Sequence, residues 1–164
     1  MSKTSLHVTM FVVAAAGVAH AGGQAGSIGL GAEYELNGIG GVSLNYDAGQ
    51  FHVGGFMGFD DPRGGNNTEF DLGGRFFYHV HKTAMADFGL GGNLGLASVP
   101  PGGPGMGQRT TNVFLEPGFE IRLFVASNVA LSFFAGLSIG VVDADHAVIS
   151  GQPTALAGVH YYFF

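Results

Sequence analysis

The chain has no cysteine, no tryptophan, few charged residues and no apolar run long enough for a membrane-spanning helix. Without cysteine, neither a disulfide framework nor a thiolate zinc site is available. Only six residues are lysine or arginine, against twelve aspartates and glutamates, and this balance argues against nucleic acid as a partner because phosphate binding needs a basic surface. Charged residues make up 11% of the chain, whereas about 25% is typical of soluble domains.

The first 21 residues have the three parts of a secretory signal peptide. Lys3 provides a positive start, residues 8–18 form an apolar centre, and residues 19–21 read Ala-His-Ala, an A-x-A cleavage site. The apolar centre is too short to cross a bilayer, which takes about 20 helical residues. We therefore expect a Sec-type signal peptide at residues 1–21 and one mature domain at residues 22–164.

Apolar and polar residues alternate along nearly all of the mature chain, which is the two-residue period of a β-strand. In the clearest segment, Leu115 and Phe119 fall on one face while Glu116 and Glu120 fall on the other. No helical period competes with this pattern. The predicted strands are residues 28–36, 42–47, 51–60, 70–80, 86–96, 113–125, 129–142 and 154–164.

Short and long connections alternate between these predicted strands, with one exception at the short Asn37-Gly38 link. Transmembrane barrels are built in this way, with short periplasmic turns, longer extracellular loops and an even number of strands. We therefore predict an all-β domain, an eight-stranded antiparallel up-and-down transmembrane β-barrel. Its tight turns are residues 48–50, 81–83 and 127–128, and its long outer loops are residues 60–67, 98–110 and 143–153.

The chemistry of the two strand faces decides between a membrane barrel and a soluble one. The apolar faces carry phenylalanine, leucine and tyrosine on every strand, and the polar faces mix glycine with single charges. An eight-stranded barrel is just wide enough inside for side chains to fill, so glycine and a few charged groups fit its lumen better than rows of aromatic rings. We expect the apolar faces to meet lipid. The alternative is a soluble secreted β-barrel binding protein.

A resemblance to known proteins supports the membrane interpretation. The segment Phe-Leu-Glu-Pro-Gly-Phe-Glu-Ile-Arg at residues 114–122, the signal peptide, the eight alternating segments and the ending Tyr162-x-Phe164 resemble small bacterial outer-membrane β-barrel proteins. These are the group of the OmpA transmembrane domain and OmpX. The resemblance implies a bacterial outer-membrane location, contact with outer-membrane lipid, and recognition of the C-terminal strand by the barrel-assembly machinery through Tyr162 and Phe164. His160 stands where the group usually has an apolar residue.

The polar faces carry ionisable residues that a barrel would place in its lumen. Such residues are costly inside a membrane and often functional, although ion pairs also commonly fill narrow barrels. We expect Arg75 and Arg122 to pair with neighbouring carboxylates. Because carboxylates outnumber these two arginines, some are protonated or exposed near the rims, or the lumen favours cations. The predicted set is Glu33, Glu35, Asp47, Glu69, Asp71, Arg75, Asp87, Glu116, Glu120 and Arg122.

Three histidines form a pattern that can bind a metal ion. His79 and His81 are spaced to share one strand face, and His52 is a third candidate ligand on the preceding strand. Polar filling of the lumen explains the same residues. We therefore predict neither a metal site nor a cofactor, with these three histidines as the candidates to be tested.

An enzyme is the third functional alternative, because some outer-membrane barrels modify lipid A or cleave peptides. A serine hydrolase needs a serine, a base and an orienting acid within reach. None of the seven histidines has a serine two residues away on the same strand face. His146 and Ser150 share the last predicted loop with Asp143 and Asp145, so a site in this loop is the remaining enzymatic alternative. We predict that the chain is not an enzyme.

The favoured function is a non-enzymatic outer-membrane barrel whose long loops mediate surface interaction with an unidentified extracellular ligand or maintain envelope integrity. A small cation-preferring pore is the main alternative, and it requires a continuous water path. Large inward side chains favour a filled lumen. The predicted ones are Phe56, Phe77, Phe114, Phe124 and Phe134.

Overall fold

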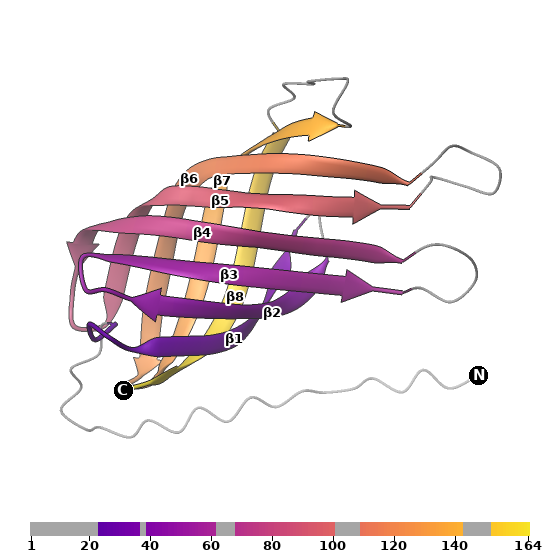
Figure 1. The fold of residues 1–164 in the computed structure, drawn as a ribbon. Coiled ribbons are helices and arrows are strands. Elements are labelled where there is room, and N and C mark those ends of the chain that lie inside the picture. The colour runs from indigo at the N-terminus through magenta and orange to yellow at the C-terminus, as the bar shows by residue number, and fades with distance from the viewer. Residues whose placement is uncertain (1–22, 37–38, 62–67, 101–108, 143–151) are drawn as a thin grey trace, which may run out of the picture.

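The computed structural model describes residues 23–36, 39–61, 68–100, 109–142 and 152–164. In these ranges eight antiparallel strands close into a barrel in sequence order, with β8 pairing back onto β1 (Figure 1). The predicted fold is confirmed. No helix in the described ranges is long and apolar enough to cross a membrane. The strands are β1 (Ile28–Glu35), β2 (Gly40–Asp47), β3 (Phe51–Asp60), β4 (Glu69–Lys82), β5 (Ala86–Val99), β6 (Thr110–Ala126), β7 (Val129–Val142) and β8 (Gln152–Phe163).

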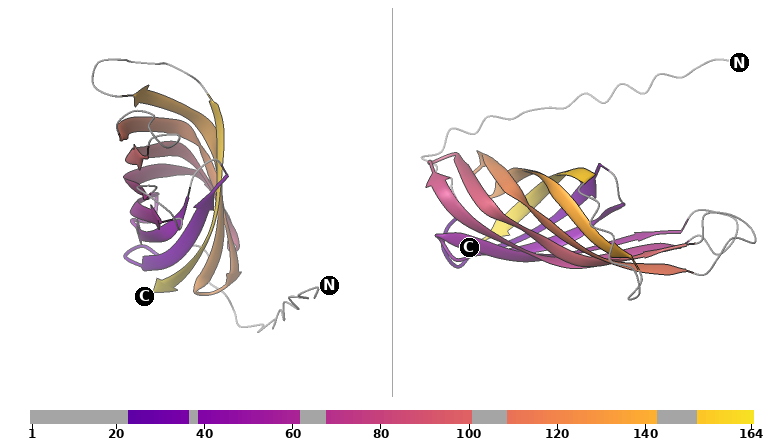
Figure 2. Two further views of the ribbon diagram at one scale, coloured as in Figure 1. Left: turned by 90° about the vertical axis from the view of Figure 1, so that its right-hand side faces the viewer. Right: turned by 90° about the horizontal axis from the view of Figure 1, so that it is seen from above.

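Strands β4, β5 and β6 are longer than the alternation predicted. The pairing of β5 with β6 continues to Val99 and Thr110, through small or hydroxylated residues that give no clear apolar-polar signal. The hairpins β3–β4 and β5–β6 consequently project beyond β1 and β2 at one end of the barrel (Figures 1 and 2).

The two ends of the barrel differ in their connections. The tight turns after β2, β4 and β6 lie at the end that also holds the C-terminus, which we call the turn end (Figure 1). The opposite end is the loop end, and most of each long predicted loop lies outside the described residues. Gly49 in the first turn has a φ of 90°, a conformation that glycine adopts without steric cost. Its backbone N–H donates to Asp47 Oδ1 at 2.8 Å.

The outer surface of the barrel is apolar on every strand. Its exposed side chains include Leu30, Leu44, Met57, Phe76, Leu94, Phe119, Phe133 and Tyr161, one from each strand in order. The described buried residues are mostly polar or charged, which reverses the distribution found in water-soluble domains. The expected assignment of the faces, apolar outward and polar inward, is confirmed.

Aromatic side chains fill part of the interior, as predicted. Phe77, Phe124 and Phe134 are buried, and the rings of Phe56 and Phe114 stack at 6.2 Å between centroids. Glycine makes this possible at close approaches. A Cβ on Gly73 would lie 2.6 Å from Cε1 of Phe56, and one on Gly95 would lie 2.9 Å from Cε2 of Phe114.

Candidate functional site in the lumen

Arg122 organises the turn end of the lumen. Its Nη2 donates to Asp47 Oδ2 at 2.7 Å and to Asp87 Oδ2 at 2.6 Å, and its Nη1 donates to the Tyr162 hydroxyl at 3.0 Å. All of these side chains are almost completely buried. One guanidinium on β6 therefore connects β2, β5 and β8 inside the lumen. Because the guanidinium is charged, its hydrogen bonds are stronger than those between neutral groups.

We call Arg122, Asp47, Asp87 and Tyr162 the Arg122 cluster. Two histidines extend it. His79 Nδ1 donates to the carbonyl of Gly49 at 3.0 Å, and its Nε2 lies 3.0 Å from Arg122 Nη2 and 2.9 Å from His52 Nδ1. His52 Nε2 lies 3.4 Å from a carboxylate oxygen of Glu120. This chain of polar contacts joins the first turn to the interior of β6.

The expectation that His79 and His81 share one strand face was wrong. His81 does not share a face with His79, because a register shift between these residues in the β4–β5 pairing turns His81 outward, where it is exposed. The structure instead brings together Asp47, His79 and Asp87, whose ligand atoms lie within 4.8 Å of one another. Arg122 already places a positive charge among them. These three residues thus surround a guanidinium, and a metal ion would have to displace it.

Arg75 bridges the middle of the lumen. It binds Glu33 through both guanidinium Nη atoms, with Nη1 donating to Oε2 at 2.9 Å, so a bidentate pair links β4 to β1. His160 Nε2 lies 2.6 Å from Ser43 Oγ and 3.8 Å from the Glu33 carboxylate. The expectation that both arginines pair with carboxylates is confirmed.

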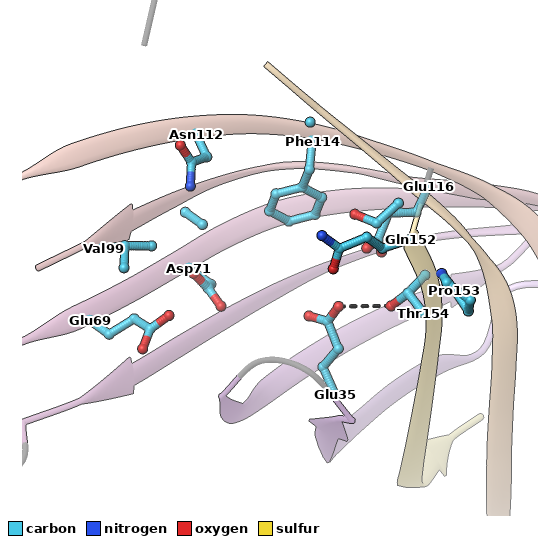
Figure 3. A pocket seen from close by; sticks show the side chains of 13 residues that line it. Glu35, Glu69, Asp71, Val99, Asn112, Phe114, Glu116, Gln152, Pro153 and Thr154 are labelled. Carbon is cyan, nitrogen blue, oxygen red and sulfur yellow. Dashed lines mark hydrogen bonds between the residues drawn. The ribbon is translucent and has the colours of Figure 1, made fainter. Parts of the chain in front are cut away.

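Four carboxylates at the loop end line a cavity of about 300 Å³ (Figure 3). Thr154 Oγ1 donates to Glu35 at 2.9 Å, and Asn93 Nδ2 donates to Glu116 at 3.0 Å. No lysine, arginine or histidine belongs to the described lining. The four acidic residues are Glu35, Glu69, Asp71 and Glu116.

The C-terminal strand contributes to the lumen in a way that the sequence pattern did not reveal. Tyr162 is 1% exposed, and its hydroxyl accepts a hydrogen bond from Arg122. Its neighbour on the same face, His160, is also buried in the lumen. The outward aromatic side chains are Tyr161 and Phe163, and Phe164 follows the strand. The polar residue at position 160 therefore has a partner in Ser43. Recognition of Tyr162 and Phe164 by the assembly machinery stays a prediction.

The hydrolase candidates lie outside the described residues. His146, Ser150, Asp143 and Asp145 all belong to residues 143–151, and the signal peptide lies within residues 1–22. Both predictions therefore stay untested by the structure.

No family model and no curated protein matches the chain. Among solved structures, the chain is similar to the N-terminal β-barrel domain of Pseudomonas aeruginosa OprF, with a TM-score of 0.67 and 12% identity over 85% of this chain and 98% of that one. Ail, the attachment invasion locus protein of Yersinia pestis, aligns with a TM-score of 0.43 and 13% identity over 84% and 95%. The likeness to the OprF domain shows the fold, an eight-stranded barrel of the outer-membrane type.

Proposed function

We propose that this chain is a non-enzymatic protein of the bacterial outer membrane, which spans the bilayer as a filled barrel and presents its loop end to the exterior. The observation that carries the proposal is the apolar outer face, which runs around all eight strands and surrounds a polar interior. A protein in water rarely exposes an apolar patch larger than a few hundred Å². In a bilayer the same face is in its preferred solvent, and the closed barrel leaves no unpaired strand edge.

The contents of the lumen support a structural barrel over an open pore. At the turn end the Arg122 cluster reaches across the interior to β2, β5 and β8. Beside it, Phe77 and Phe134 meet edge to face with ring centroids 5.7 Å apart. Ions crossing the lumen would have to break these contacts. Interaction through the loop end then remains as the route by which such a protein acts.

Insertion into lipid is tested by heat-modifiable migration. We expect the protein taken from outer membranes, or folded into phospholipid vesicles, to migrate faster in SDS when unboiled than when boiled. The physical reason is that a closed, hydrogen-bonded barrel resists the detergent until it is heated. Recovery of the mature protein from the periplasm in soluble form would contradict the proposal and favour the soluble binding protein.

Planar-bilayer recording separates the filled barrel from the cation-preferring pore. We expect no stable conductance above the bare bilayer, because the Arg122 cluster obstructs the turn end. The acidic loop end is the observation in favour of the pore. A stable, cation-selective conductance from the wild-type barrel would therefore replace the filled-barrel proposal with the pore.

A further inference from the structure

Charge is divided unevenly along the lumen. Arg122 forms ion pairs with Asp47 and Asp87 at the turn end. Arg75 forms an ion pair with Glu33 in the middle of the lumen. The four acidic residues of the loop-end cavity have no basic side chain in its described lining. They converge from three strands, β1, β4 and β6, around one space with Phe114 and Asn112 (Figure 3).

Two buried oxygen atoms, one in the lining of this cavity and one beside it, have no hydrogen-bond partner among the described residues. Asp71 is 7% exposed and Asn93 is 3% exposed, and in each case Oδ1 lacks a donor. Both residues line a smaller cavity that shares Glu35, Asp71 and Glu116 with the larger one. Leaving a buried hydrogen-bond acceptor unpaired costs free energy. Carboxylate and amide oxygens are also the ligands that hard cations such as Ca²⁺ and Mg²⁺ prefer. Asn93 donates to Glu116 through Nδ2, so its amide oxygen is a further acceptor held beside the same carboxylates.

We propose that the loop-end cavity binds one divalent metal cation, held with part of its hydration shell. The spacing of the carboxylates supports retained water. Among the described residues, one trio of candidate ligands has its ligand atoms within 4.8 Å of one another, and it lies at the turn end: Asp47, His79 and Asp87. No three of the loop-end carboxylates come this close together. The loop-end carboxylates therefore do not form a close cage, while a cavity of about 300 Å³ has room for a cation and its waters. Mg²⁺ in particular keeps several waters and is held by one or two carboxylates.

Titration with Mn²⁺ tests this site directly. The mature barrel is folded in a zwitterionic detergent free of bacterial lipid and is then titrated with Mn²⁺. Electron paramagnetic resonance measures the concentration of unbound Mn²⁺ at each step. We expect one saturable site per barrel, displaced by Mg²⁺ but not by K⁺ at the same ionic strength. Asp71→Asn and Glu116→Gln should each weaken the Mn²⁺ affinity about tenfold or more, because each removes one negative charge from the site.

Asp60→Asn is the matched control. Asp60 lies at the loop end of β3, is exposed and is outside the cavity lining, so this substitution removes the same charge and should change the affinity less than about twofold. The unboiled gel band reports folding of each variant, and Glu35→Gln replaces any variant that fails to fold. Absence of saturable Mn²⁺ binding by the wild type would overturn the proposal. The charge of the four carboxylates would then be neutralised by protonation instead of by a metal ion. An equal loss in Asp60→Asn would also overturn it, because binding would then belong to the acidic surface.

Discussion

Arg122→Leu should lower the free energy of unfolding by about 3–5 kcal/mol, the usual cost of leaving a buried charge without its partner. The substitution keeps an apolar stem of similar size but removes the donors to Asp47, Asp87 and Tyr162. Two nearly fully buried carboxylates then face each other without a cation. Urea unfolding in phospholipid vesicles, followed by the fraction of the unboiled gel band, measures the change.

Arg109→Leu serves as the control for this experiment. Arg109 is exposed, and its guanidinium donates to Ser98 and to the carbonyl of Thr68, so we expect a loss of about 0–1 kcal/mol. Adding Asp87→Asn to Arg122→Leu should recover part of the stability, since it removes one of the unpaired charges. If Arg122→Leu costs no more than Arg109→Leu, the cluster does not stabilise the barrel.

Leu94→Arg should destabilise the vesicle-inserted barrel by about 2–4 kcal/mol, as expected for a charge on the lipid face near the bilayer midplane. Leu94 lies near the middle of β5 and is 57% exposed on the outer face. Its partners in the neighbouring strands are Leu115 and Gly74, so no acidic group is at hand to neutralise the new charge. The measurement is again urea unfolding from vesicles.

Leu36→Arg is the matched control, because Leu36 is exposed just beyond the end of β1 at the loop end. There the cost should fall to about 0–1 kcal/mol. The comparison also tests the membrane assignment itself. If both variants change stability by less than about 0.5 kcal/mol, as surface substitutions in water usually do, the outer face does not lie in lipid.

The faces of the strands could be predicted because alternation is a local property of a strand, and the barrel followed from the even number of alternating segments and the lengths of their connections. Successive side chains point to opposite sides, so Glu116 and Glu120 had to share a face that Leu115 and Phe119 do not. The same period placed Arg75 and Arg122 inside the barrel. The lengths of β5 and β6 were underestimated, since the small or hydroxylated residues near their paired ends carry no alternation.

The partners across the lumen could not be predicted in the same way. Arg122 and Asp47 are 75 residues apart, and they meet because barrel closure and strand stagger bring them to the same height. A register shift sent His81 outward, and the pairing of β8 with β1 and β7 set Tyr162 against Arg122.

The sequence by itself therefore determined which side chains face the interior, because alternation along a strand is a property of the chain. Only the tertiary structure decided which of them touch. It placed Arg122 at the turn end and Arg75 in the middle of the lumen. It also gathered four acidic residues at the loop end without a basic partner in the described lining, namely Glu35, Glu69, Asp71 and Glu116. The physical reason is that contacts across a barrel depend on its stagger and closure, which no single strand encodes.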